Sequence, residues 1–181
     1  MELRFPNMLI VAGTGRNVGK TSFVCEIIER IASQQQVIAI KISPHFHQVS
    51  ESEKLVKRTN EYEIIEELAS ENSKDSSRML KAGANRVFYV QTKTDKAMLE
   101  VIENLKSFWK ENTAVVCESG GLRHIVEPGL FVVCKSEEQQ EMKPRLNKLE
   151  TEVDQFVLFR NNKFNLDLTR IKFENGTWRM S

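Results

Sequence analysis

The chain has 181 residues, of which 40% are hydrophobic and 28% are charged, with a formal net charge of +1 at pH 7. This length and composition are typical of one globular domain with its own core, so residues 1–181 are expected to form a single domain. The near-zero net charge argues against a nucleic-acid-binding or acidic-membrane-binding protein, because such surfaces are usually built from a clustered excess of basic residues.

Apolar runs indicate buried parallel strands, and most are separated by helical patterns or long connections. The runs lie at 8–12, 37–42, 86–91, 113–117, 129–134 and 155–159. Apolar residues at helical spacing occur within 24–31 and 98–109, and each set would form a helix face that packs on the sheet. This alternation predicts an α/β fold with an open, mostly parallel sheet and helices on both faces.

The first strand leads into a glycine-rich loop that is typical of phosphate-binding sites. Glycines let backbone N–H groups turn onto phosphate oxygens, while a lysine and the hydroxyl after it face the β and γ phosphates and Mg²⁺. A helix beginning at the last glycine would direct its positive end at the same anion. The loop therefore predicts an ATP or GTP site, with an ordinary strand-to-helix turn as the alternative. Its residues are Gly13, Thr14, Gly15, Arg16, Asn17, Val18, Gly19, Lys20, Thr21 and Ser22. Thr14 stands where the standard spacing has a glycine, so the loop is a variant.

The connection 43–85 is too long for a simple crossover and is mostly polar, with a helical patch predicted from Tyr62 to Leu68. We expect it to contact substrate or to act as a lid, and we expect Ser43 to Asn72 to be the most mobile part of the free chain. His45 and His47 in this segment could bind a metal or a substrate phosphate. Because they lack a third ligand at metal spacing, the sequence favours the interpretation that they are ordinary polar loop residues.

Carboxylates near the carboxyl ends of the strands are candidates for the magnesium site that a nucleotide triphosphatase needs. Glu118 follows the run at 113–117 and precedes Ser-Gly-Gly, where ligands bind in open α/β sheets, and an exposed strand-end glutamate is the alternative. Asp75 is a second candidate, although it could equally cap a helix that runs to Lys81. Lys41 ends the second strand at the same edge, where a surface lysine is the alternative. Lys20, Lys41 and Glu118 are the predicted catalytic residues.

Two features near the C-terminus complete the prediction: a weak indication of a base-binding site and a β-hairpin with a structural role. Asn161 and Asn162 follow the strand at 155–159, and one or the other is a possible adenine contact, although the choice between ATP and GTP stays open. The segment from Leu168 to Met180 predicts a β-hairpin, because Asn-Gly at its centre suits a type I′ turn.

The expected compartment is the cytoplasm. No apolar run reaches membrane-spanning length, and the N-terminus lacks the layout of a signal peptide. The three cysteines, Cys25, Cys117 and Cys134, lie in apolar segments without the paired spacing of a zinc site. Such an odd set is typical of reduced core thiols.

Together these residues resemble the dethiobiotin synthetase and cobyrinic acid amide synthase branch of P-loop NTPases, in which a glycine precedes Gly-Lys-Thr by five intervening residues, as Gly13 does here. The closest resemblance is to the molybdopterin-guanine dinucleotide biosynthesis accessory protein family. It rests on the loop, on Ile40-Lys41, on Lys74-Asp75-Ser76 and on Ala82-Gly83-Ala84, and covers roughly residues 7 to 121. The resemblance implies a P-loop fold and a magnesium site formed by Thr21, Asp75 and Glu118.

The function that the resemblance implies is Mg²⁺-dependent binding and hydrolysis of ATP or GTP in cofactor biosynthesis, as an accessory protein or a small ATP-dependent ligase. The partners expected are the nucleotide, a small-molecule or cofactor substrate and a possible second copy of the chain. A regulatory or scaffold module that binds nucleotide without significant hydrolysis is the alternative, with the segment 43–85 as its switch.

Overall fold

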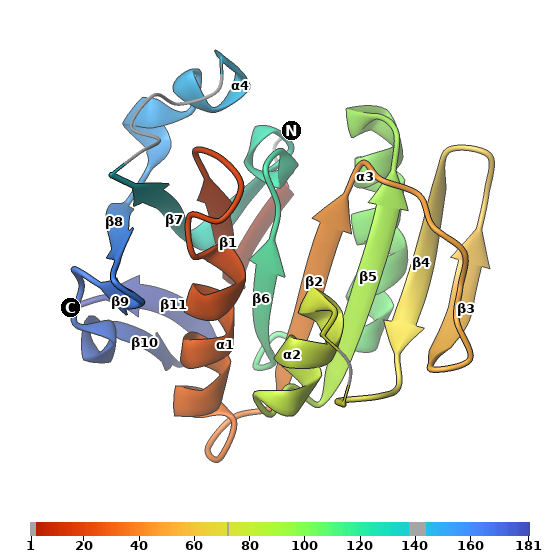
Figure 1. The fold of residues 1–181 in the computed structure, drawn as a ribbon, viewed down its shortest axis with the longest axis horizontal. Coiled ribbons are helices and arrows are strands. Elements are labelled where there is room, and N and C mark those ends of the chain that lie inside the picture. The colour runs from red at the N-terminus through yellow and green to blue at the C-terminus, as the bar shows by residue number, and fades with distance from the viewer. Residues whose placement is uncertain (1–2, 72, 138–143) are drawn as a thin grey trace.

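The computed structural model describes residues 3–71, 73–137 and 144–181, and within them the chain forms a nine-stranded sheet (Figure 1). The strand order is β3-β4-β5-β2-β6-β1-β7-β8-β9. From β5 to β8 all neighbours are parallel, whereas β3, β4 and β9 are added antiparallel at the two ends. The strands are β1 (Leu3–Gly13), β2 (Val37–Ser43), β3 (Glu53–Arg58), β4 (Tyr62–Glu67), β5 (Arg86–Thr92), β6 (Ala114–Glu118), β7 (Val126–Ser136), β8 (Gln155–Arg160) and β9 (Lys163–Phe164).

The six predicted strands are confirmed, since each falls in one of the parallel strands, with the run at 113–117 displaced by one residue from β6. Buried side chains on these strands point to both faces of the sheet and form two cores. Such strands read as continuous apolar runs because neither face meets water.

Helices cover both faces of the sheet, as the sequence predicted (Figure 1). The helices α1 (Lys20–Ile31) and α2 (Asp75–Lys81) pack on one face, and α3 (Asp95–Leu105) packs on the other. The short helix α4 (Pro144–Asn147) lies beyond β7. No helix in the described part of the chain is both long and apolar enough to cross a membrane. Cys25, Cys117 and Cys134 are free and buried, in agreement with the expectation of core thiols.

The predicted C-terminal hairpin is present as β10 (Ile171–Glu174) and β11 (Thr177–Met180). Its two central residues have positive φ angles, 52° at Asn175 and 72° at Gly176, as a type I′ turn requires. Trp178 on this hairpin is fully buried, and its indole N–H donates to the carbonyl oxygens of Asn7 at 3.0 Å and Val115 at 3.1 Å. These bonds fix the hairpin against β1 and β6.

The segment 43–85 adds a hairpin, β3 and β4, to one end of the sheet and then forms α2. The helical patch predicted from Tyr62 to Leu68 is wrong, because β4 occupies Tyr62–Glu67 and pairs antiparallel with β5. Ile64 and Ile65 are both fully buried, and a short run buried on both faces has no strand-like alternation. Closure of this segment over a ligand stays a prediction, and Asn72, at the end of its expected mobile part, lies outside the described residues.

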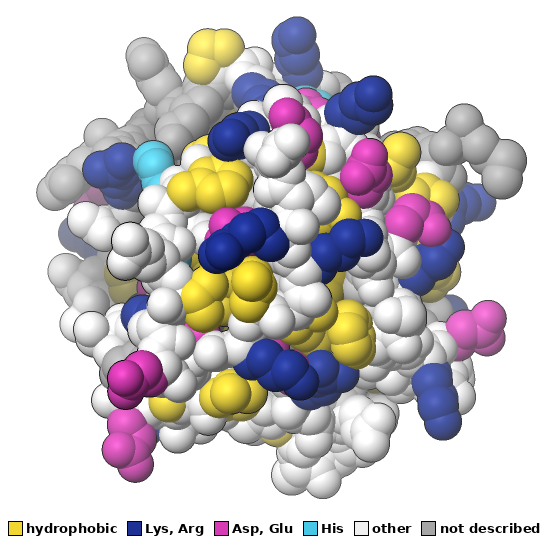
Figure 2. Space-filling view, turned by 90° about the vertical axis from the view of Figure 1, so that its right-hand side faces the viewer, with side chains coloured by type: hydrophobic (Ala, Val, Ile, Leu, Met, Phe, Trp, Pro, Cys, Tyr) yellow, Lys and Arg dark blue, Asp and Glu magenta, His cyan; other side chains and the backbone are white. Residues whose placement is uncertain are grey.

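The edge strand β3 is not arranged for pairing with a further strand. Its exposed positions include Lys54, Lys57 and Arg58, and its register with β4 shifts between Leu55 and Lys57. Figure 2 looks onto this end of the molecule and shows Lys and Arg side chains spread among hydrophobic ones. Basic side chains and irregular register both discourage edge-to-edge association.

Candidate functional site

The glycine-rich loop leaves the end of β1 and closes where α1 begins. The last glycine, Gly19, precedes α1 with a φ of 83°, so the helix starts one residue later than predicted. A Cβ atom at Gly13 would lie 2.6 Å from the Val18 Cγ2 atom, and one at Gly19 would lie 2.5 Å from the Phe159 ring. Both positions therefore require glycine, and they hold the loop tightly between β1, α1 and β8.

The N-terminus of α1 is arranged to receive an anion. Gly19 has no side chain to cap the helix, and the first turn carries no acidic residue. The N–H groups and positive dipole end of the helix therefore face the loop without a competing carboxylate. The Lys20 ammonium donates to the Gly15 carbonyl oxygen at 2.6 Å, which holds its charge over the loop. Positive charge and N–H donors thus gather where phosphates are predicted to bind.

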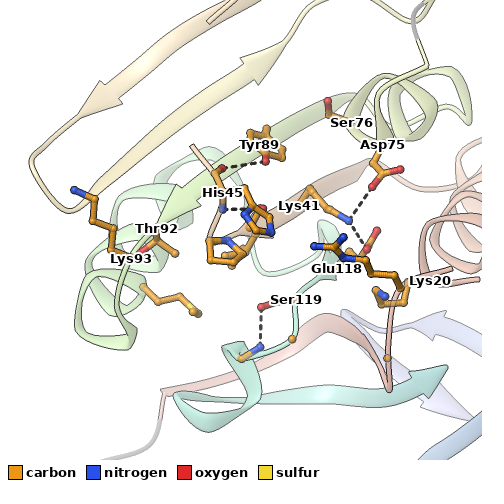
Figure 3. Close-up of a pocket in the computed structure, with 18 of the residues that line it drawn as sticks. Lys20, Lys41, His45, Asp75, Ser76, Tyr89, Thr92, Lys93, Glu118 and Ser119 are labelled. Carbon is orange, nitrogen blue, oxygen red and sulfur yellow. Dashed lines mark hydrogen bonds and ion pairs between the residues drawn. The ribbon is translucent and has the colours of Figure 1, made fainter. Parts of the chain in front are cut away.

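Four of the predicted site residues lie in one network at the carboxyl ends of the central strands. The Glu118 side chain is 2% exposed, accepts a hydrogen bond from the Thr21 hydroxyl at 2.8 Å, and pairs with the Lys41 ammonium. The same ammonium lies 2.9 Å from the Asp75 carboxylate, so Lys41 bridges the two acids (Figure 3). Lys41 and Glu118 are direct neighbours in the register of β2 and β6, which explains how strand ends far apart in sequence meet.

The electrostatics of this network keep Lys41 charged. Burial alone would lower the pKa of the Lys41 ammonium, but the charges and hydrogen bonds of Glu118 and Asp75 outweigh it and raise the pKa above its ordinary value. Arg78, which the sequence analysis missed, donates to the Ser22 hydroxyl at 3.1 Å and lies 3.7 Å from the Asp75 carboxylate. Its position one helical turn after Asp75 was the available signal.

The donor set of the network fits Mg²⁺ bound together with a nucleotide. Among the described residues, no group of three His, Cys, Asp or Glu side chains is placed to hold a metal ion by itself. In nucleotide sites, however, Mg²⁺ is usually held by one or two protein oxygens together with phosphates and water. The Thr21 hydroxyl and the carboxylates of Asp75 and Glu118 supply hard oxygen donors of this kind, linked through Lys41.

Two hollows meet at this network. The larger is a cavity of about 910 Å³ that reaches from the loop across the ends of β2 and β5 to the start of α3 (Figure 3). The smaller, about 460 Å³, lies on the α1 side of the loop and extends to Phe159 and Asn162. Lys20, Lys41 and Glu118 line both hollows, so two ligands could meet at these side chains.

The predicted base contacts have a structural role of their own. Asn161 and Asn162 form the turn between β8 and β9, with positive φ angles of 50° and 57° that asparagine tolerates well. Asn162 lines the smaller hollow, whereas Asn161 is not among its lining residues. Phe159, which the sequence analysis missed, lies against Gly19 and lines the same hollow. Only its position at a strand end near the loop could have suggested it.

The two histidines line the larger cavity without a third metal ligand beside them in the described structure. The His47 backbone is fixed to the fully buried Gln91, which accepts from its N–H at 2.5 Å and donates to its carbonyl oxygen at 3.2 Å. The His47 ring lies 4.8 Å from the Tyr89 ring, between centroids. The segment after β2 therefore forms a wall of the cavity, in the region where substrate contacts were predicted.

Arg145 also lines the larger cavity, and it pairs with Asp95 at the start of α3. Its guanidinium is so close to Gly121 that a Cβ atom there would lie 2.8 Å from it. Nothing local in the sequence singled out this arginine. Comparisons of the chain with protein-family models, curated proteins and solved structures found no match. The functional interpretation therefore depends on the geometry of the site.

Proposed function

We propose that this chain binds Mg²⁺ and ATP or GTP on the loop from Gly13 to Ser22 and uses the nucleotide in a cofactor-biosynthesis reaction in the cytoplasm. The observation that carries the proposal is the joining of the loop to the strand ends. Thr21 at the start of α1 donates to the buried Glu118, which pairs with Lys41 beside Asp75. A strand-to-helix turn without a ligand role would not need a buried carboxylate beneath its first helical hydroxyl.

In this proposal the protein acts mainly by positioning and charge, as is general for phosphoryl transfer. Backbone N–H groups of the loop bind the phosphates, and the Lys20 ammonium offsets charge on the γ-phosphate. Thr21, Asp75 and Glu118 would hold Mg²⁺, which neutralises developing charge on the phosphate oxygens. The smaller hollow, with Phe159 and Asn162, is the proposed site of the base, and the larger cavity is the proposed site of a second substrate.

The lining of the larger cavity favours an anionic small molecule. Six cationic side chains face it against three carboxylates, and complementary charge guides such ligands into clefts. The cations are Arg16, Lys20, Lys41, Lys74, Lys93 and Arg145, and the carboxylates are Asp75, Asp95 and Glu118. A role as a small ATP-dependent ligase or accessory protein, as in the dethiobiotin synthetase-like group that the motifs resemble, agrees with this arrangement. Assembly into a homodimer is part of the same expectation.

A thermal-shift screen tests the nucleotide proposal. The melting temperature is measured with ATP, GTP or ADP, each with and without Mg²⁺. The Lys20→Ala variant is measured under the same conditions. A ligand at about 100 times its Kd should stabilise the native state by about 2.7 kcal/mol, and only when Mg²⁺ is present and Lys20 intact. If no nucleotide raises the melting temperature, the proposal is wrong. Binding without turnover, even after adding small carboxylic acids, would instead identify a regulatory or scaffold module.

A further inference from the structure

The residues on either side of Asp75 are anchored to the β3–β4 hairpin. Lys74, just before Asp75, places its ammonium 2.7 Å from the Glu53 carboxylate on β3. Ser76, just after it, donates from its hydroxyl to the Glu67 carboxylate at the end of β4 at 2.8 Å. Asp75 is therefore held between two contacts that lead back to the same hairpin.

Both anchoring carboxylates are buried, which makes them unlike ordinary surface acids. The Glu53 side chain is 1% exposed and Glu67 is 2% exposed. Burying a carboxylate is unfavourable unless hydrogen bonds or an opposite charge compensate it. Glu53 also accepts from the Ser50 N–H at 2.8 Å and the Ser50 hydroxyl at 2.9 Å. Glu67 also accepts from the Ala69 N–H at 3.3 Å.

The Glu53 carboxylate keeps its charge in this environment. Burial would raise the pKa of Glu53, but the hydrogen bonds from Lys74 and Ser50 outweigh it and hold the pKa below its ordinary value. The pair of Glu53 with Lys74 is therefore an ionic contact at neutral pH. It joins a buried point on β3 to the residue that precedes α2.

The helix that carries Asp75 needs such anchors. It has only seven residues, and Lys74 at its N-cap position makes no side-chain capping bond. Helices this short are marginal on their own, and their position depends on tertiary contacts. Asp75 itself is 41% exposed, so packing does little to fix its carboxylate near Lys41.

We propose that Glu53 and Glu67 are positioning residues that hold Asp75 at the Lys41–Glu118 network. In this arrangement the β3–β4 hairpin does not contact the ligand itself; it positions Asp75 through its bonds to Lys74 and Ser76. The inference depends on the proposed function, because the position of Asp75 matters for ligands only if the network binds Mg²⁺ with nucleotide.

The main test compares how much Mg²⁺ is needed for half of the nucleotide-dependent thermal stabilisation. Glu67→Ala should raise that concentration about tenfold, the effect of losing one hydrogen bond to a charged group. Asp75→Asn should raise it at least as much, because it removes the charge of the proposed Mg²⁺ ligand itself. The double variant should be no worse than Asp75→Asn alone, because both changes act through one carboxylate. Glu67→Gln keeps an oxygen acceptor for Ser76 and should recover most of the loss.

Glu66→Ala is the matched control, because Glu66 is the neighbouring acid on β4 and pairs with Arg86 on β5 at 2.6 Å, with no hydrogen bond or ion pair to α2 among the described residues. It should change the Mg²⁺ requirement by less than about twofold, since distant sites contribute independently. If Glu67→Ala folds poorly, Ser76→Ala removes the same contact from the helix side.

A second readout needs no ligand. In the free protein, amide hydrogen exchange at Arg78 and Ala82, whose N–H groups bond within α2, should be faster in Glu67→Ala than in Glu66→Ala. Equal exchange rates in Glu67→Ala and Glu66→Ala would overturn the inference. So would a Mg²⁺ requirement in the double variant that equals the product of the two single effects, or a Mg²⁺ requirement in Glu66→Ala that rises as much as in Glu67→Ala. Absence of any nucleotide effect in the parent protein would refute the proposed function, while the exchange comparison would still decide whether Glu67 holds α2.

Discussion

Replacing Lys41 by methionine should destabilise the protein strongly, because it removes the ammonium between two carboxylates. Glu118 is 2% exposed and Lys41 is 16% exposed at the side chain, so the pair is screened little by water. Removing one partner of a buried pair typically costs about 3–5 kcal/mol. Because Thr21 still donates to Glu118, we expect the lower end, about 3 kcal/mol, or a melting temperature about 6–12 °C lower for a chain of this size.

The measurement is urea and thermal unfolding of Lys41→Met at pH 7, beside two controls. Lys54→Met removes an exposed lysine from β3 and should stay within about 0.5 kcal/mol of the parent. Lys41→Met with Glu118→Gln removes both charges and should recover most of the lost stability. If Lys41→Met is as stable as the parent, or if the double variant is no better than the single one, the account of Glu118 as a buried charge held by Lys41 is wrong.

The pH dependence of the same variant gives a separate check. The pKa of Lys41 is raised in the folded protein, so its contribution is fully present below the unfolded value of about 10.4 and is lost as pH rises through the folded value. The free energy of unfolding of the parent should therefore exceed that of Lys41→Met at neutral pH, and this difference should shrink only in the strongly alkaline range. A difference that already disappears between pH 7 and 9 would contradict this sign.

Four further outcomes are expected. Lys20→Ala should abolish nucleotide-dependent stabilisation without unfolding the protein, because it removes the cation that faces the predicted phosphates; undiminished binding would contradict the phosphate site. Glu118→Gln should reduce turnover or Mg²⁺ dependence more than nucleotide affinity. A variant that hydrolyses nucleotide at the parental rate with unchanged Mg²⁺ dependence would disprove this. The three buried thiols should resist alkylation at pH 7 until the protein unfolds, because burial raises their pKa values, to about 11 for Cys25. Hydrogen exchange between Ser43 and Asn72 should slow when Mg²⁺-nucleotide and substrate bind, and equal protection in both states would remove the lid hypothesis.

The sequence predicted best those features that are determined locally. Buried parallel strands are apolar throughout, the helix faces repeat at the helical period, and Asn175-Gly176 favours one kind of turn wherever it occurs. The loop motif is local in the same sense, because Gly13 packs against Val18 and Lys20 of the same loop and Gly19 has a positive φ angle. These predictions required no knowledge of which strands pair.

Features that depend on distant partners were missed or misinterpreted. The segment from Tyr62 to Leu68 was predicted as a helical patch because neighbouring apolar residues in it lack strand-like alternation, and only pairing with β5 makes Tyr62–Glu67 a strand. The alternative roles of Lys41 and Asp75, a surface lysine and a helix-capping acid, could not be distinguished until the register placed Lys41 opposite Glu118. Arg145 approaches the cavity from α4, and no motif surrounds it.

The two buried glutamates of the hairpin show the physical reason why features that depend on distant partners cannot be predicted from the sequence. On a strand, an acid is normally a sign of a solvated face, since burial of a charge is unfavourable, and both Glu53 and Glu67 would be assigned to the surface on that basis. Their burial is tolerated because Lys74, just before α2, and Ser76 in α2 supply donors. These donors flank the acid that contacts Lys41, so the same bonds that compensate the buried charges also fix a side chain of the candidate site. If Glu53 and Glu67 hold Asp75 as proposed, the stability of the hairpin and the geometry of the site are coupled through α2, and a substitution in β4 is expected to alter ligand binding without touching either hollow.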